Sequence, residues 1–330
     1  MYRNPLHDEH LVQNLEDSLR AEERDNGAPN LSRVHVPQEL LRKPTLSRLI
    51  QLASVDWLVI GMSWVLLSWG NPIFIPLCML VVAGRLHSFG VILHDAAHMP
   101  MRTKTLGWRV LEILAGYPDF TTINALRYHH IRHHRDSGMP TDPYLKPNCK
   151  GRPLLLAYYH LRGVILLPFW CLRGFVGPLA FIFPRLRTFY GRVFLQDKFR
   201  TDLTQSREVK DCAREDIGQL LFTVGVVYCG FYHPHFVFYG FIFPGVIAGL
   251  LAATRLMKEH DYIPNQDRTM LTIIRTTNDH GLGWVGKVFT APRNIGYHIT
   301  HHLHPQVSLE SLPKLRAWYV KTYPEIYPGN

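Results

Sequence analysis

Two long stretches of the chain contain no charged side chain, and this feature limits the possible folds more than any other. Asp, Glu, Lys and Arg are absent from Trp57 through Gly84 and from Ile217 through Thr254. Each stretch is too long for one buried helix of a soluble core and long enough for two membrane-spanning helices of about 20 residues each. Two buried helical hairpins in a soluble protein are the alternative. The sequence therefore predicts an all-α integral membrane protein.

Both charge-free stretches are interrupted near the middle by residues that end helices. Gly70-Asn71-Pro72 divides the first stretch and His233-Pro234-His235 divides the second. Gly, Pro and Asn favour turns over continued helix. We therefore expect four transmembrane helices in two hairpins, over residues 52–70, 73–93, 217–233 and 236–257.

The distribution of basic residues predicts how these helices are oriented. Both turns lack Lys and Arg, whereas the segments that flank the first hairpin contain Arg42, Lys43 and Arg48 before it and Arg102, Lys104 and Arg109 after it. Positively charged loops stay on the cytoplasmic side of a membrane. We therefore expect cytoplasmic termini and a cytoplasmic N-terminal arm over residues 1–50, with a short charged helix at 8–24. The membrane domain covers 51–330, and its residues 94–216 and 258–330 form a cytoplasmic helical cap.

The apolar and aromatic segment from Leu154 to Phe183 is expected to lie on the membrane surface. Arg162 and Arg173 interrupt it, and a spanning helix with two central arginines is costly. Amphipathic helices in the headgroup layer accommodate such side chains.

The net charge and the cysteines limit the partners and the compartment. The formal charge is +10, which indicates attraction to anionic lipid headgroups or to an acidic protein. The basic residues flank predicted spans and match no recognition motif for nucleic acid, so no nucleic-acid partner is expected. The five cysteines form no C-x-x-C pair, which fits a reducing, cytoplasm-facing protein.

Three clusters hold ten of the 19 histidines: His94 and His98; His129, His130, His133 and His134; His298, His301, His302 and His304. Residues at i, i+3 and i+4 share one face of a helix, so each cluster presents its rings together. Imidazole binds iron, zinc, copper and nickel, and no single ion accommodates eight rings. The density of the clusters disfavours ordinary packed or solvated histidines and predicts a site for two metal ions.

Other enzyme motifs fit these residues less well. His94-Asp-Ala-Ala-His98 is similar to the H-E-x-x-H helix of zinc proteases, which needs the glutamate as general base. Asp95 is one methylene shorter, and a single zinc would leave two clusters without a role. Soluble di-iron bundles use Glu-x-x-His pairs, and the chain contains no such pair.

The complete pattern resembles the membrane fatty-acid desaturase and hydroxylase superfamily. Boxes of the form H-x-x-x-H, H-x-x-H-H and H-x-x-H-H are separated by paired spans, and Asp142-Pro143 follows the second box. Asn294 to Pro305 is similar to the family motif N-x-x-Y-H-x-x-H-H-L-x-P. The resemblance covers roughly residues 50–320 and implies a non-haem di-iron centre that uses O₂ and two electrons to attack an unactivated C–H bond.

The resemblance also implies which residues bind the two iron ions. The eight box histidines are His94, His98, His130, His133, His134, His298, His301 and His302. A ninth ligand is implied at the end of the fourth span, where His260 stands; a surface histidine beside acids is the alternative. His129 and His304 lie outside the family pattern, and we expect them around the site or at the surface.

Carboxylates near the boxes are candidates for orienting the ligand rings. A metal-bound imidazole is neutral, and an acceptor on its other nitrogen sets the ring orientation. The nearest acids are Asp95, Asp142, Glu259 and Asp261, although each also fits an ordinary surface or loop acid. Asn294 joins these candidates through the motif, and His87 is expected to pack.

Three functions are consistent with these features. The first is an O₂-dependent desaturase acting on a fatty-acyl chain, carried by a membrane lipid or an acyl carrier. The second is a hydroxylase or ketolase of a lipid or carotenoid. A membrane metal-binding or transport protein is the third, but transporters place ionisable ligands within the spans, whereas these clusters lie past the span ends.

The chemistry also needs an electron supply. The chain has no flavin, haem or iron–sulfur motif, so we expect a separate donor of the ferredoxin or cytochrome b5 type. Arg127, Arg132 and Arg135, within or beside the second box, are the first candidates for its docking patch, with contact to lipid headgroups as the alternative.

Overall fold

The computed structural model describes residues 35–101, 103–265, 267 and 269–327. The expected helix at 8–24 lies outside these residues. The described part is helical, as predicted, and its only extended pairing is an isolated antiparallel bridge between His260 and Thr277.

The first hairpin consists of α2 (Leu46–Ser68) and α3 (Phe74–Ala97). Helix α2 begins where the Thr45 side chain accepts a hydrogen bond from the Arg48 N–H, which satisfies one of the free donors at a helix start. The turn between the helices contains Gly70 at φ 71°, a left-handed conformation that costs glycine little. Helix α3 continues past the expected span and carries the first histidine box.

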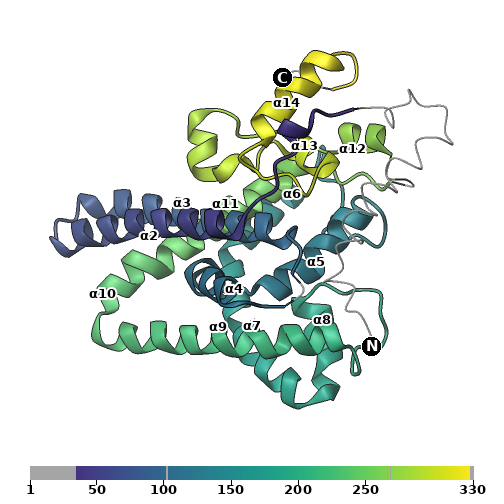
Figure 1. Ribbon diagram of the computed structural model, residues 1–330. Coiled ribbons are helices and arrows are strands. Elements are labelled where there is room, and N and C mark those ends of the chain that lie inside the picture. The colour runs from purple at the N-terminus through teal and green to yellow at the C-terminus, as the bar shows by residue number, and fades with distance from the viewer. Residues whose placement is uncertain (1–34, 102, 266, 268, 328–330) are drawn as a thin grey trace.

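The expected second hairpin corresponds to α9 (Arg207–Tyr232) and the nearly continuous α10 (Pro234–Val237), η8 (Phe238–Ile242) and α11 (Phe243–Glu259), which a turn at His233 joins to α9. In Figure 1 the turns of both hairpins lie on the left, away from α13 and α14. Trp64 of α2 donates a hydrogen bond of 2.8 Å to the Gly240 carbonyl. This bond joins the two hairpins within their apolar part.

Four helical segments among the described residues are long and apolar enough to cross a membrane: Leu46–Ser68, Phe74–Ala97, Pro153–Ile182 and Pro234–Glu259. Three of them correspond to the expected first, second and fourth spans, with ends that differ by a few residues. The expected third span lies in α9, which is not one of these four segments. The charged residues from Arg207 to Asp216 lower the hydropathy of α9. The segment 153–182, expected on the membrane surface, is one of the four.

The segment 153–182 is built from α6 (Pro153–Leu161), η6 (Arg162–Ile165) and α7 (Leu166–Ile182). Its fully buried Arg173 pairs with Asp216 of α9, with 3.2 Å between Nε and Oδ2. Helix α9 in turn exposes a row of apolar side chains, including Leu221, Val224 and Phe231, as a lipid-facing helix does. Which of the two segments crosses the membrane stays a prediction.

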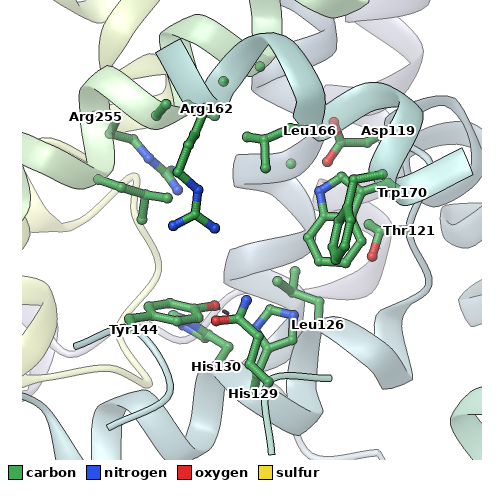
Figure 2. A pocket seen from close by; sticks show the side chains of 18 of the residues that line it. Asp119, Thr121, Leu126, His129, His130, Tyr144, Arg162, Leu166, Trp170 and Arg255 are labelled. Atoms are coloured by element: carbon green, nitrogen blue, oxygen red, sulfur yellow. Dashed lines mark hydrogen bonds between the residues drawn. The ribbon is translucent and has the colours of Figure 1, made fainter. Parts of the chain in front are cut away.

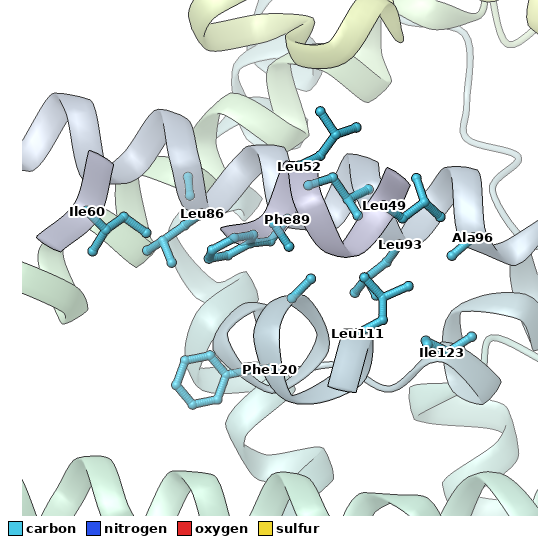
Figure 3. Close-up of a cluster of buried hydrophobic side chains, with 14 of the residues drawn as sticks. Leu49, Leu52, Ile60, Leu86, Phe89, Leu93, Ala96, Leu111, Phe120 and Ile123 are labelled. Carbon is cyan, nitrogen blue, oxygen red and sulfur yellow. The ribbon is translucent and has the colours of Figure 1, made fainter. Parts of the chain in front are cut away.

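The remaining elements form the part of the fold that carries the histidines. They are η3 (Gln38–Leu40), α4 (Leu106–Leu111), η4 (Glu112–Gly116), η5 (Tyr117–Asp119), α5 (Ile123–Asp136), η7 (Pro184–Leu186), α8 (Arg187–Phe194), α12 (Met270–Thr276), η9 (Gly286–Thr290), η10 (Pro292–Asn294), α13 (His298–Leu303) and α14 (Leu312–Thr322). Figure 3 shows the apolar core in which Leu49, Phe89 and Leu93 of the first hairpin pack beside Leu111 and Ile123. This packing holds α5, and therefore the second box, against α3.

A buried polar cluster ties the third box to the first hairpin. Asp56 in α2 is fully buried and accepts hydrogen bonds from Ser88 at 2.7 Å, Arg85 at 3.0 Å and Arg293 at 2.7 Å. Arg293 lies in η10, five residues before His298. The two positive charges and the hydroxyl group offset the cost of burying the carboxylate.

Candidate metal centre

Four segments bring the nine candidate ligands together. His94 and His98 come from the end of α3, and His260 directly follows α11. Helix α5 supplies the second box and α13 the third. All nine rings are buried.

The ring nitrogens form two groups. In the first group, ligand atoms of His94, His98, His130, His134 and His301 all lie within 4.8 Å of one another, and in the second those of His133, His260 and His302 do. His298 stands beside the second group, with its Nε2 3.2 Å from His260 Nε2 and 3.1 Å from His302 Nε2. The predicted ligands therefore divide into sets of five and four.

The distances between ring nitrogens fit common metal ligands. Nε2 atoms are 2.8 Å apart between His98 and His130 and 3.1 Å apart between His134 and His301. Ligands at right angles around one ion, each about 2.1 Å from it, stand about 3.0 Å apart. A hydrogen bond between two rings joins only two nitrogens, whereas a metal ion can bind all the nitrogens of one group.

Helix geometry explains the division. Successive residues are about 100° apart around a helix with 3.6 residues per turn, so His133 and His134 join different groups, as do His301 and His302. His130 and His134, four residues apart, join the first group, and His298 and His302 join the second. The expectation of one common direction per box is therefore too coarse, because the second and third boxes each serve both groups. The rings of His134 and His302 stack between the groups with centroids 4.2 Å apart.

Burial holds the rings in the neutral form that binds metal. It is the largest cause that lowers the pKa of His260 and His301 to about 3, and the neighbouring His133 lowers the pKa of His260 further. Burial also lowers the pKa of His98, His130 and His134 well below the usual value. Neutral rings whose nitrogens converge in two groups are a donor set that fits two transition-metal ions.

Asp142 is the predicted carboxylate that contacts a candidate ligand most directly. Its Oδ1 lies 2.9 Å from Nδ1 of His133, and backbone N–H groups of Gly138 and Tyr144 donate to the same carboxylate. Burial alone would raise the pKa of Asp142, but His133 and these N–H groups lower it overall. The resulting anion orients His133 so that its Nε2 lies 3.2 Å from that of His260.

The other three acids have different surroundings. Glu259 Oε1 lies 3.6 Å from Nδ1 of His298 and 3.6 Å from Nε2 of His280, which is ion-pair distance but beyond a hydrogen bond. Asp95 bonds to Ser308 and Leu309. Asp261 accepts a 2.7 Å hydrogen bond from the side chain of Asn278.

The remaining predicted residues contact tyrosines or the backbone. His129 Nδ1 is 2.6 Å from the Tyr144 hydroxyl, and His304 Nε2 is 2.6 Å from that of Tyr319. Asn294 adopts a left-handed conformation, φ 66°, and its carbonyl accepts the Tyr297 N–H. His87, expected to pack, bonds through Nδ1 to the Phe289 carbonyl at 2.7 Å.

Arg127 is not part of a surface patch, so its inclusion among the donor-docking residues was wrong. Its side chain is 3 % exposed and donates to the Ala97 carbonyl at 2.6 Å, at the end of α3. Arg132 bonds Glu208 at 2.8 Å, whereas the Arg135 side chain is 55 % exposed and pairs with Asp136.

A cavity of about 600 Å³ opens beside both groups of histidines, with His94, His130, His133 and His298 in its wall. Figure 2 shows Leu126, Leu166 and Trp170 on its sides together with the polar side chains of Asp119, Arg162 and Arg255. The sequence motifs did not identify Asp119, Arg255 or His280 as residues of the site. For Arg255 a signal existed, since it is the first charged residue after the second charge-free stretch.

Comparison with known proteins adds one match. The family model described as fatty acid desaturase matches residues 67–329. No curated protein matches the chain.

Proposed function

The chain belongs to the fatty acid desaturase family, as its histidine motifs predicted, and on this basis we propose that it is an O₂-dependent di-iron oxidoreductase that introduces a double bond into a fatty-acyl chain or a related lipid. The observation that carries the proposal is the convergence of nine buried histidines, eight in two groups and His298 beside the second, next to a cavity. Bound iron would supply the oxidising chemistry, activating O₂ with two electrons for attack on a C–H bond.

The residues of the chain have distinct roles in this proposal. His94, His98, His130, His134 and His301 hold one ion, and His133, His260, His298 and His302 hold the other. Asp142 keeps His133 oriented, and Leu126, Leu166 and Trp170 exclude water and position the alkyl part of the substrate. A separate ferredoxin- or cytochrome b5-type protein supplies the electrons on the cytoplasmic side.

The ligand positions favour this proposal over metal transport. Transporters bind ions near the midplane of the membrane, between broken spans. Here His98 directly follows α3 and His260 directly follows α11, so both lie at helix ends. A hydroxylase or ketolase would use the same ligands, and analysis of the product separates it from a desaturase.

Metal content and lipid products test the proposal together. The purified chain should contain two iron ions, and cells that express it should accumulate an unsaturated lipid, detected by mass spectrometry, that an empty-vector control lacks. His94→Ala and His302→Ala each remove a ligand from a different group and should abolish the product. The matched control is His235→Ala, an exposed histidine in the second hairpin turn. An active His133→Ala variant, or one zinc per chain, would contradict the assignment.

A further inference from the structure

Two arginine side chains enter the cavity beside the histidines. Figure 2 shows Arg162 of η6 and Arg255 of α11 extending from the same wall, across from His129, His130 and Tyr144. These two guanidinium groups line the cavity on the wall opposite the histidines, and Lys146, Arg192 and Lys198 also line it.

A glycine contact brings the elements that carry these arginines together. Gly163 in η6 packs directly on Gly249 in α11, and a Cβ added to Gly163 would lie 2.5 Å from the Gly249 carbonyl oxygen. Larger residues at either position would separate the two elements. The proximity of the arginines to the same cavity thus follows from close backbone packing.

The described residues leave the charge of Arg162 without an ion pair and part of the Arg255 guanidinium without a hydrogen bond. Arg162 is an exposed residue at the rim of the cavity, makes no ion pair with the described residues and lies near the rings of Tyr158 and Tyr159. Arg255 Nε forms an ion pair of 3.3 Å with Glu259 Oε1, but the buried Nη1 of Arg255 has no hydrogen-bond partner within the described part of the chain.

Asp119 lines the same cavity and does not cancel this charge. Its burial raises the pKa to about 8, although Arg255 and Arg173 act in the opposite direction. At neutral pH most Asp119 carboxyls are therefore protonated, and they can donate a hydrogen bond.

An alkyl chain alone is a poor occupant of such a cavity. It would displace water from guanidinium groups without replacing their hydrogen bonds, which costs free energy. Carboxylates and phosphates match the paired N–H groups of arginine. We propose that Arg162 and Arg255 bind an anionic group of the substrate inside the cavity, so that the site takes an anionic amphiphile instead of a neutral lipid.

This inference rests on the proposed function, because it concerns the substrate of the same site. Glu259 neighbours both Arg255 and His298, so the anionic group is held on the side of the second group of histidines.

Binding of matched probes tests the proposal. The iron-loaded chain, in nanodiscs of phosphatidylcholine, is titrated with laurate, dodecyl phosphate and methyl laurate. Laurate or dodecyl phosphate should bind at least tenfold more tightly than the uncharged ester, and whichever binds better distinguishes a carboxylate from a phosphate ligand. Arg162→Gln and Arg255→Gln should each remove most of this preference and leave ester binding unchanged.

Lys258→Gln is the matched control, since Lys258 is exposed on the same helix three residues after Arg255. It should bind all three probes like the unaltered chain. Arg162 forms no ion pair in the described structure, so its replacement reports on binding even if Arg255→Gln disturbs Glu259. Equal binding of laurate, dodecyl phosphate and ester, or an unaltered preference in Arg162→Gln, would overturn the proposal. If two irons are bound without such a preference, the inference fails and the proposed function stands; if iron does not bind at all, the proposed function fails first.

Discussion

The Nδ1 atom of His133 lies 2.9 Å from Oδ1 of Asp142, nine residues further along the chain. Between them the chain reverses at Gly138, whose φ of 75° is left-handed, and the Gly138 N–H donates to the other oxygen of the same carboxylate. The acid is therefore held by the turn that it also stabilises. A ligand ring and the loop after its helix are positioned as one unit.

Asp142→Ala should weaken the second group of ligands and leave the fold intact. Loss of the acceptor that orients a ligand histidine typically lowers metal affinity or activity about 10–100-fold. Iron retained after dialysis against a graded series of chelator concentrations measures this change. Asp261→Ala is the control, because Asp261 is next to His260 but bonds to Asn278. Equal iron loss in both variants would show that Asp142 has no special role.

The metal-free protein should lose stability as the pH falls below 6.5. Burial lowers the pKa of His129, His260 and His301 from 6.5 to about 3. Their rings stay neutral in the folded chain, whereas the unfolded chain takes up protons below pH 6.5. The contribution of these rings to the free energy of unfolding is therefore fully present above pH 6.5. It falls between pH 6.5 and pH 3 by about 1.4 kcal/mol per ring and pH unit.

Thermal unfolding in detergent, followed between about pH 7.5 and pH 5, measures this dependence. The midpoint should drop in the metal-free protein and drop less in the iron-loaded one, because bound metal competes with protons for the same nitrogens. A midpoint that is constant or rises toward pH 5 would contradict the neutral, buried histidines.

The hairpin turns should be accessible from the side of the membrane opposite the histidines. Asn71 and His235 are both exposed. In a cysteine-free background, Asn71→Cys and His235→Cys should react with an impermeant thiol reagent added to intact cells. Labelling of neither position, or of only one, would refute the predicted topology.

Cysteines on both sides of the segment 153–182 decide whether it spans the membrane. Lys150 and Arg185 are exposed at its two ends. If the segment lies on the cytoplasmic surface, Lys150→Cys and Arg185→Cys should both react only after the cells are permeabilised. If it crosses, one of the two should react in intact cells, and α9 is then not the third span.

Turnover driven by a protein electron donor should fall as the salt concentration rises, because exposed arginines attract the donor. Electrostatic docking loses on-rate as ionic strength rises. Arg135 is the most exposed of the three predicted docking residues, so Arg135→Glu should lower protein-driven turnover several-fold and leave turnover with a small chemical reductant unchanged. Arg214→Glu, another half-exposed arginine, serves as the matched charge reversal. If Arg135→Glu lowers both kinds of turnover equally, docking at this patch is ruled out.

Local spacing was enough to predict the histidine site, because residues at i, i+3 and i+4 meet on a helix whatever surrounds it. The same rule places Arg255 beside Glu259, four residues apart on α11, but it could not place His280 beside Glu259. Glu259 and His280 come from segments far apart in the sequence that pair beside the bridge between His260 and Thr277, where the Asn278 N–H donates to the Glu259 carbonyl. Hydropathy likewise could not decide whether the segment 153–182 or α9 crosses the membrane. The free-energy cost of burying Arg173 depends on its ion pair with Asp216, which sequence spacing does not reveal.

The bond between Asp56 and Arg293 has a consequence for how the protein is made. Asp56 belongs to the first hairpin to leave the ribosome, whereas Arg293 is synthesised 237 residues later. A nascent chain can pair Asp56 with Arg85 early, but the cluster is complete only when η10 arrives. The three histidines of α13 follow within the next nine residues, so both metal sites stay open until biosynthesis is nearly finished. A chain that terminates before residue 292 therefore inserts its hairpins and still lacks ligands in both groups.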